Sequence, residues 1–520
     1  MSQVERRYLL NTAQLRNLHH WTADERSSMT SAVVVELSGG IPPQDAIQAV
    51  HALLGRHEAL RARLARDSLG NPVQEVLTPA GAAAELAVQR IDLSAGIEAE
   101  PVPERVIPEE LAVSCALFLL GDQVSAVKLS VSHVFTDAFG VQVVTRDLRA
   151  LLNRDPLDPV LPRQAGEYAR AAEDPLIRAN TQRWKDLLAD SPRSCTYSAV
   201  SREEYEKARD VWVPLVTDRV GAAARKLRAT PYVIWSAIIS SFVQLVSGQH
   251  RQVFRSTYAN RGIPADSRAV AQLAQAVYLP IDGRPEDTFR ARVARISRVT
   301  FLTLRWGNYD AIGLLDWLSD SANARGAMFQ PAFEMNYIPL PPDEKGTAEP
   351  VELDIRESLD IRESLVRLDP LSAKADFAIT VIHKPSPAVR FSVRRPVGQQ
   401  RVAEEVARDC LTVMRMLCEN PDQPIGDVPV RPFTQELLHG HHSGVAVAPA
   451  ATCDLVGSVP GVASCAVELG GDGKLIAHVS ASAPLSVDGM LPALRRKQPW
   501  LSGSVVPDRF DIAYPAGVTD

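Results

Sequence analysis

The chain has 520 residues, 46% of them hydrophobic and 23% charged, which is the composition of a folded globular protein. This length corresponds to about three domains of ordinary size. Acidic residues exceed basic ones by 62 to 56, giving a formal net charge of −6. Such a balance excludes a chain that binds nucleic acid or a membrane through a strongly basic face, so we expect neither partner.

The sequence predicts a cytoplasmic protein. No stretch reaches the roughly eighteen uninterrupted apolar residues of a spanning helix, and the opening MSQVERRYLL lacks the apolar core of a signal peptide. The cysteines are scattered without a C-x-x-C spacing, which favours buried free thiols over a disulfide framework or a zinc site. They are Cys115, Cys195, Cys410, Cys418, Cys453 and Cys465.

The first predicted elements are a strand over residues 30–39 and a helix that begins near Pro42 and Pro43, where proline is tolerated. Residues 111–133 predict a β-hairpin that turns at 121–123. In its return strand the period of two places His133 on the same face as three apolar residues. A helical run follows from residue 141.

The second half of the chain alternates helical and strand-like patterns. Helices are predicted over 163–189, 217–247 and about 401–418, and Thr230 and Pro231 have the residue types of an N-cap and a first helical position. Strands are predicted over 253–262, 332–340 and 377–383. The tandem LDIRES at 353–358 and 359–364 indicates a local duplication in a surface segment rather than a repeat architecture.

Near 420–450 the chain becomes rich in proline, glycine and small residues, which is typical of a linker. The last seventy residues predict a separate small unit with a hairpin that turns at 470–473 and then a short helix. His439, His441 and His442 are residue types that bind metals, but they lie in a linker with no nearby Cys, Asp or Glu, so we expect no metal site there.

The segment SHVFTDAFG (132–140) is the best candidate for chemistry. Its histidine, His133, ends a buried strand just before a helix, and a neutral imidazole is suited to take a proton from an amine or hydroxyl nucleophile. Asp137 can pair with an arginine and fix the loop; the alternative is a solvated surface carboxylate. On residue pattern alone, H-x-x-x-D is a weak signal, because a lone histidine on an apolar face is more often a satisfied core residue.

The segment resembles the H-H-x-x-x-D-G motif of nonribosomal peptide synthetase condensation domains, which are similar to chloramphenicol acetyltransferase. His133 matches the second, catalytic histidine and Asp137 the aspartate. The sequence departs from the motif at Ser132, the first histidine position, and at Ala138, the glycine position. We expect Gly140 to restore flexibility to the loop.

Further stretches resemble the family in the same order. They are RYLLNTAQLRNLHHW (7–21), RHEALRARL (56–64), 253–262 with Asn260-Arg261-Gly262, AVAQLAQAVYLPID (269–282), FEMNYIP (333–339) and DFAITV (376–381). The resemblance implies a buried salt bridge between Asp137 and Arg261, with Arg61 as the second candidate partner, and a substrate contact at Asn336.

The resemblance implies an α/β fold of two acetyltransferase-like subdomains arranged as a V-shaped pseudodimer, over 1–170 and 171–435. A linker (436–450) and a small α+β unit (451–520) follow. The small unit resembles the C-terminal subdomain of adenylation enzymes, with Val518 at the position of its lysine. We interpret it as a remnant or docking module.

The implied reaction is amide formation by acyl transfer. The donor is a thioester on the phosphopantetheine arm of a carrier protein acting in trans, the acceptor is a free or carrier-bound amine, and no bound cofactor is required. Two alternatives stay open, ester formation with an alcohol acceptor and a non-catalytic platform that binds carrier proteins.

Overall fold

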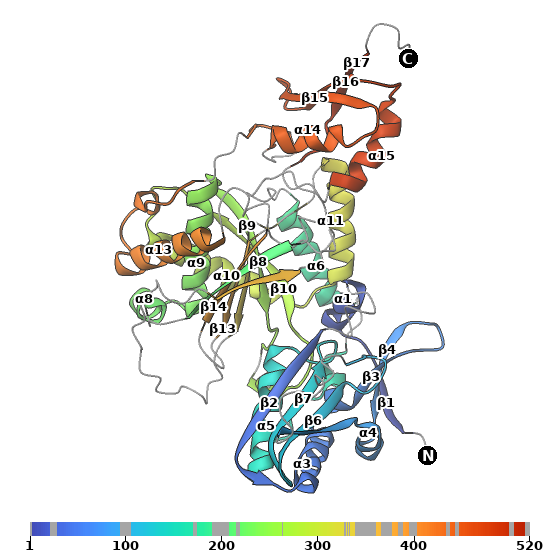
Figure 1. The fold of residues 1–520 in the computed structure, drawn as a ribbon. Helices are drawn as coiled ribbons and strands as arrows, with labels where there is room; N and C mark the ends of the chain where they lie inside the picture. Colours follow the sequence, from blue (N-terminus) through green and yellow to red (C-terminus); the bar gives the residue numbers. More distant parts are fainter. Residues whose placement is uncertain are drawn as a thin grey trace. The chain divides into compact units, whose positions relative to one another are not determined.

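The computed structural model describes 17 stretches of the chain: residues 3–20, 29–93, 106–169, 174–189, 207–214, 219–262, 264–326, 329, 331, 333–338, 360–365, 377–382, 388–394, 403–432, 437–442, 447–498 and 504–514. The chain divides into two compact units. The first holds residues 1–179, 258–275 and 308–312, and the second holds 180–257, 276–307 and 313–520. Two short segments from later in the sequence therefore return to the first unit (Figure 1).

The first unit contains two antiparallel-rich sheets. A four-stranded sheet has the order β2-β7-β6-β5, with β2 Thr30–Ile41, β7 Gln123–Ser132, β6 Val113–Leu120 and β5 Val88–Asp92. A three-stranded sheet has the order β1-β4-β3, with β1 Val4–Leu9, β4 Pro72–Leu77 and β3 Ala62–Arg66. The predicted hairpin is confirmed as β6 and β7.

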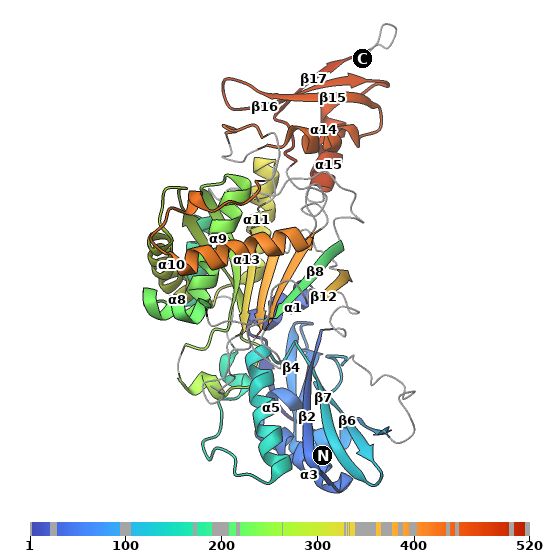
Figure 2. The same ribbon diagram turned by 60° about the vertical axis from the view of Figure 1, so that its left-hand side comes forward.

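Helices α3 (Pro43–Arg56) and α5 (Ala138–Asn153) pack on each other and on the four-stranded sheet, as Figure 2 shows. Alternate residues of β7, including Val127, Leu129 and Val131, are fully buried in the core between sheet and helices. Shorter helices α1 (Thr12–His20) and α4 (Pro79–Glu85) complete the unit. Burial of one face of β7 fixes its register, because a slip of one residue would expose this apolar row.

The second unit is built on a seven-stranded mixed sheet with the order β10-β9-β11-β13-β14-β8-β12. The strands are β8 Lys207–Pro214, β9 Arg251–Tyr258, β10 Gln275–Asp282, β11 Glu334–Ile338, β12 Asp360–Leu365, β13 Phe377–Ile382 and β14 Ala388–Arg394. β11 pairs in parallel with β9 and β13, whereas β13, β14, β8 and β12 pair antiparallel in succession.

Five of the helices in the described part of the chain accompany this sheet. They are α6 Pro175–Leu188, α8 Arg219–Leu227, α9 Pro231–Ser247, α10 Phe289–Thr303 and α13 Ala403–Glu419, with α11 (Ala311–Arg325) nearby in sequence. Figure 2 shows α13 lying across the sheet, and it contacts β8 and β14. The Thr230 hydroxyl caps α9 by accepting the Val233 N–H at 3.3 Å, so the predicted start of this helix is confirmed.

The described helices are short or polar relative to a membrane span. No single one of them combines the length and mean hydropathy of a span; α8 and α9 do so only when joined, and the chain bends by 103° between them.

A small module closes the chain. Its sheet has the order β15-β16-β17, with β15 Val462–Leu469 antiparallel to β16 Leu475–Ala481 and β17 Arg509–Ala513 parallel to β16. Helices α14 (Pro449–Gly457) and α15 (Val487–Lys497) supply Leu455 and Leu494 to a local apolar cluster. The predicted hairpin and short helix are both present here.

The prediction of one helix over 163–189 is wrong for its first part. Residues Ala165–Tyr168 form only a 3-10 turn, η3, and α6 begins at Pro175. Gly166 packs directly on the Tyr8 ring of β1, where an added Cβ would lie 2.3 Å from the phenol Cζ. The 3-10 turn therefore lies against β1. The second LDIRES copy contributes β12, an edge strand beside β8, and the first copy lies outside the described residues.

Candidate active site

The segment 132–140 joins the last residue of β7 to the first turn of α5. The His133 N–H donates to the Met29 carbonyl at 2.9 Å, and the Phe135 N–H donates to the Ser132 carbonyl at 3.2 Å. The backbone on both sides of His133 is therefore bonded to sheet and turn. This gives the imidazole a rigid support, as the sequence pattern predicts.

The His133 ring is half-buried, and its Nδ1 lies 2.5 Å from the Thr136 carbonyl oxygen. A carbonyl oxygen can only accept, so the neutral ring carries its proton on Nδ1. The basic lone pair of the neutral imidazole is then on Nε2. The local turn thus selects the tautomer and the orientation in which Nε2 can accept a proton from a nucleophile.

Asp137 is buried and forms a bidentate ion pair with Arg261. Its two oxygens accept from the guanidinium at 2.7 and 2.8 Å, and the exposed side-chain fractions are 1% for Asp137 and 6% for Arg261. The same carboxylate accepts the N–H groups of Gly140 at 2.9 Å, as the N-cap of α5, and of Leu273 and Ala274 at 3.1 Å. With five donors, Asp137 is a structural acceptor rather than a proton carrier.

Arg261 comes from the segment 258–275, which returns to the first unit from later in the chain. Its guanidinium also donates to the carbonyls of Ala259, Ala269 and Ala271 at 3.0 to 3.4 Å and lies over the Phe139 ring, 5.1 Å from the centroid. The ion pair therefore ties the motif loop to this returning segment.

Ser132 and Gly140 are both explained by close packing. Ser132, at the first histidine position of the motif, is fully buried, and its hydroxyl lies 3.4 Å from the Val134 N–H. Gly140 lies inside the first turn of α5, where an added Cβ would be 2.2 Å from the Thr136 hydroxyl. The expectation that Gly140 makes the loop flexible is wrong, because the residue is helical and provides space for Thr136.

Arg61, the second candidate partner of Asp137, makes other contacts. Its guanidinium donates to Glu5 at 2.5 Å and to the Leu77 carbonyl. In the same RHEALRARL stretch, His57 lies 3.0 Å from Asp147 on α5. Burial lowers the pKa of His57 against the opposing pull of Asp147. This stretch connects α3 to α5 and to β4 rather than to the motif loop.

Asn336, the candidate substrate contact, belongs to the second unit. It lies on β11, half-buried, opposite Thr380 of β13 in the parallel register. The pairing of β11 with β13 fixes the position of its Cα in the sheet.

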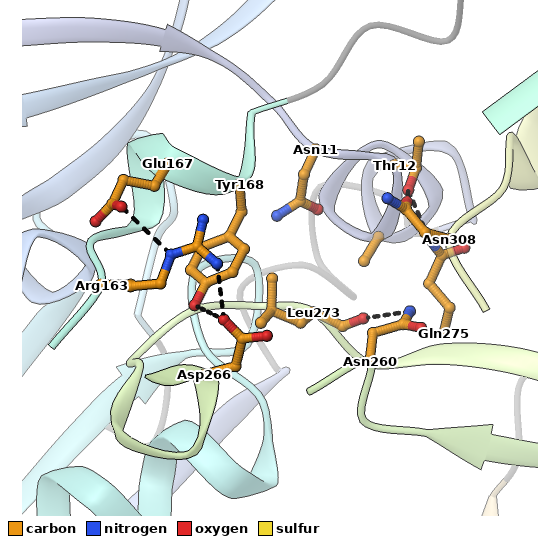
Figure 3. Close-up of a pocket in the computed structure, with 11 residues that line it drawn as sticks. Asn11, Thr12, Arg163, Glu167, Tyr168, Asn260, Asp266, Leu273, Gln275 and Asn308 are labelled. Carbon is orange, nitrogen blue, oxygen red and sulfur yellow. Dashed lines mark hydrogen bonds and ion pairs between the residues drawn. The ribbon is translucent and has the colours of Figure 1, made fainter. Parts of the chain in front are cut away.

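A polar pocket of about 200 Å³ lies in the first unit beside the ion pair, and Figure 3 shows its lining. On one side, Asp266 accepts from Arg163 at 3.0 Å and from the Tyr168 hydroxyl at 2.8 Å. On the other, Gln275 donates to Thr12 at 2.5 Å, and Thr12 donates to Asn308 at 3.0 Å. His133 is not one of the lining residues.

The pocket and the ion pair share the segment 258–275. Leu273 lines the pocket while its N–H donates to Asp137. Burial, with the Asp266 carboxylate adding to the effect, raises the pKa of Tyr168, so this phenol stays protonated and donates. The sequence did not indicate Arg163, Tyr168 or Asp266 as pocket residues, because the helical pattern over 163–189 is misleading at Tyr168, which lies in a 3-10 turn, and Asp266 lies in another such turn.

The loop, the histidine and the ion pair together match the motif of one family. The Condensation domain family model matches residues 4–438. This chain belongs to the condensation domain family. The prediction of family membership from the ordered motifs is confirmed.

Individual relatives are distant. The chain is 22% identical over 336 residues to the hybrid PKS-NRPS synthetase buaA of Petromyces alliaceus, a match that covers 61% of this chain and 8% of the synthetase. It spans less than a tenth of the length of the curated relatives it matches.

Solved condensation domains share the fold. The first condensation domain of the calcium-dependent antibiotic synthetase, in complex with a substrate analogue, has a TM-score of 0.59 at 18% identity and covers 82% of this chain and 99% of its own. The condensation domain of the Monacolin K polyketide synthase MokA has a TM-score of 0.62 at 16% identity, covering 82% and 100%. The predicted α/β, acetyltransferase-like fold class is confirmed.

The small C-terminal module lies outside the family match. Val518 is not among the described residues, so the interpretation of the module as an adenylation-enzyme remnant stays a prediction. Of the cysteines, Cys115, Cys410 and Cys418 are buried as predicted, Cys453 and Cys465 are half-buried, and Cys195 lies outside the described residues.

The premise that the linker histidines have no acidic neighbour is wrong. His441 and His442 both lie within hydrogen-bond distance of Asp508, 66 residues further along the chain from His442. The proximity depends on the parallel pairing of β17 with β16, which sequence spacing alone does not reveal.

Proposed function

We propose that this chain is an acyltransferase that forms an amide between a carrier-bound donor and an amine acceptor. The donor acyl or aminoacyl group arrives as a thioester on the phosphopantetheine arm of a carrier protein acting in trans, and the acceptor amine is a free small molecule or is itself carrier-bound. No bound cofactor enters the reaction. The observation that carries the proposal is the Nδ1 contact of His133 with Thr136, which makes Nε2 the basic atom of the neutral ring.

In the proposed reaction the amine nitrogen attacks the thioester carbonyl carbon, a C–N bond forms and the C–S bond breaks. His133 Nε2 takes the proton that the amine loses and passes it to the departing sulfur, which leaves as the free thiol of the carrier arm, so the imidazole ends neutral. The Thr136 carbonyl supports the Nδ1–H as positive charge develops on the ring. General-base assistance of this kind contributes about 10²–10⁴-fold, and positioning of the already activated thioester contributes to the remainder.

An alcohol acceptor would use the same residues and yield an ester. A non-catalytic platform that binds carrier proteins is favoured by one observation, the replacement of the first motif histidine by the buried Ser132. Ser132 is the last residue of β7, whereas His133 lies in the turn that follows, where its ring contacts the Thr136 carbonyl. The orientation of His133 therefore depends on its contact with Thr136, and we favour the catalytic function.

The test is to incubate the full chain with an acyl-loaded carrier protein and a panel of paired acceptors, each amine matched to the alcohol of the same skeleton. Formation of amide, followed by mass spectrometry, supports the proposal. Formation of ester only would replace amide synthesis by ester synthesis at the same site. Saturable carrier binding without any acyl transfer across the panel would establish the platform and overturn the catalytic proposal.

A further inference from the structure

Three metal-ligating side chains converge in the C-terminal part of the chain, outside the region that the family model matches. His441 Nε2 lies 3.0 Å from Asp508 Oδ2, and His442 Nε2 lies 2.8 Å from Asp508 Oδ1. The two imidazole centroids are 4.3 Å apart. One ligand atom from each of the three residues falls within 4.8 Å of the other two.

The backbone around this cluster is held by further hydrogen bonds. The Leu475 N–H donates to Asp508 Oδ2 at 2.8 Å, and the His442 N–H donates to the Gly473 carbonyl at 2.9 Å. Gly473 has φ of +75° and approaches Gly440 so closely that an added Cβ would lie 2.8 Å from the Gly440 carbonyl oxygen. Carboxylates that bind metals are usually held in place by hydrogen bonds from neighbouring groups, as Asp508 is here.

The geometry is close to that of a tetrahedral zinc site. With Zn–N bonds of about 2.0–2.1 Å and Zn–O bonds of about 2.0–2.2 Å, neighbouring ligand atoms are roughly 3.3 Å apart. The two imidazole nitrogens lie 2.8 and 3.0 Å from different oxygens of the same carboxylate, and one ligand atom from each of the three side chains lies within 4.8 Å of the other two. Rotation of these side chains brings the two nitrogens and one carboxylate oxygen to the separations of a zinc site.

The cluster is also reachable from solvent on one side. The side chain of His441 is 1% exposed, while those of His442 and Asp508 are 43% and 24% exposed. An ion can enter past His442, and a water molecule can take the position that the three protein ligands leave open.

We propose that His441, His442 and Asp508 bind a zinc ion, which ties the segment 437–442 to the start of β17. Two imidazole nitrogens and one carboxylate oxygen suit a borderline cation such as Zn²⁺ better than Mg²⁺ or Ca²⁺, which favour all-oxygen sites. The ion takes the position of the Nε2 proton of each ring, and each neutral imidazole then carries its proton on Nδ1.

The test uses the untagged full chain after removal of metal with EDTA. Titration with Zn²⁺ in a calorimeter should give one saturable site per chain, and Co²⁺ should give the visible absorption bands of a tetrahedral complex. Zn²⁺ should also raise the melting temperature. His442→Ala, at an exposed position, should fold normally and lose at least tenfold in affinity, together with the Co²⁺ bands.

Asp508→Asn keeps an acceptor for the Leu475 N–H while removing the charge, and we expect the same loss in this variant. The matched control is His439→Ala, because His439 is exposed, lies in the same segment and is not part of the cluster. It should bind Zn²⁺ as the wild type does. Absence of a saturable site in the wild type, or full affinity in His442→Ala, would show that the cluster is only a hydrogen-bonded one and would overturn the proposal.

Discussion

Replacement of Asp137 by alanine should destabilise the first unit strongly. The variant removes the carboxylate that receives two guanidinium hydrogen bonds and leaves Arg261, whose side chain is 6% exposed, without its counter-charge. Breaking a buried ion pair in this way costs about 3–5 kcal/mol. For a domain of about 200 residues, each kcal/mol corresponds to roughly 2–4 °C in Tm, so we expect Tm to fall by about 6–20 °C.

The assay is thermal unfolding of the purified full chain, followed by circular dichroism and calorimetry. Asp45→Ala is the matched control in the same unit, because the pair of Asp45 with Arg154 is exposed and is worth about 1 kcal/mol or less. The double variant Asp137→Ala/Arg261→Met removes both buried charges and should be less destabilised than the sum of the two single variants.

A wild-type Tm for Asp137→Ala would refute the reasoning, and so would strict additivity in the double variant. Either result would mean that water reaches the pair and screens it. Loss of condensation activity in the fraction that stays folded is also expected, since the same carboxylate caps α5 directly after the turn that orients His133.

Four further outcomes are expected. Burial lowers the pKa of His57, so below about pH 6.5 the unfolded state binds a proton at this residue before the folded state does. The contribution of His57 to the free energy of unfolding should therefore be constant above that pH and fall below it. In urea unfolding between about pH 7 and 5, His57→Gln should lose less stability than the wild type, and equal losses would contradict this. Burial raises the pKa of Asp147, but its contacts with His57 and Arg146 outweigh burial and lower the pKa to about 2. The contribution of Asp147 to the free energy of unfolding should therefore persist down to about pH 4 and be lost on further acidification. Gly140→Ala should cost about 1–3 kcal/mol through its clash with Thr136, measured by urea unfolding, and Thr136→Ala should rescue it; a stable single variant would be inconsistent with the close contact. A carrier-bound donor should react much faster than the same acyl group on N-acetylcysteamine at equal concentration, because carrier contact raises the effective concentration of the thioester; equal rates would indicate a free small-molecule acyltransferase.

The sequence predicts an element correctly where a local residue pattern is compatible with only one secondary structure. The alternation in 111–133 predicts the β6–β7 hairpin because one face of β7 carries a row of buried apolar residues, and Thr230-Pro231 predicts the start of α9 through its capping chemistry. The Asp137–Arg261 contact joins residues 124 apart. No periodicity encodes such a distance, and only the family motif indicated Arg261 rather than Arg61.

Features that depend on chain return could not be predicted. Asp266 meets Tyr168 in the pocket because 258–275 folds back into the first unit, and Asp508 meets His441 because β17 pairs in parallel with β16. Both acidic residues follow irregular segments, where local sequence specifies neither the path nor the neighbour. Gly140 was placed in a loop because the helix signal starts with apolar spacing at Val141, whereas the Asp137 cap starts α5 three residues earlier.

The central claim is that Nε2 of His133 handles the proton of the acceptor. The most direct measurement compares wild type with His133→Asn in the carrier-dependent condensation assay. An Asn side-chain amide can still donate to the Thr136 carbonyl in place of Nδ1–H, but it has no basic atom at the position of Nε2. The account predicts an unchanged Tm and a rate lower by about 10²–10⁴-fold. A folded His133→Asn variant with wild-type rate would contradict it.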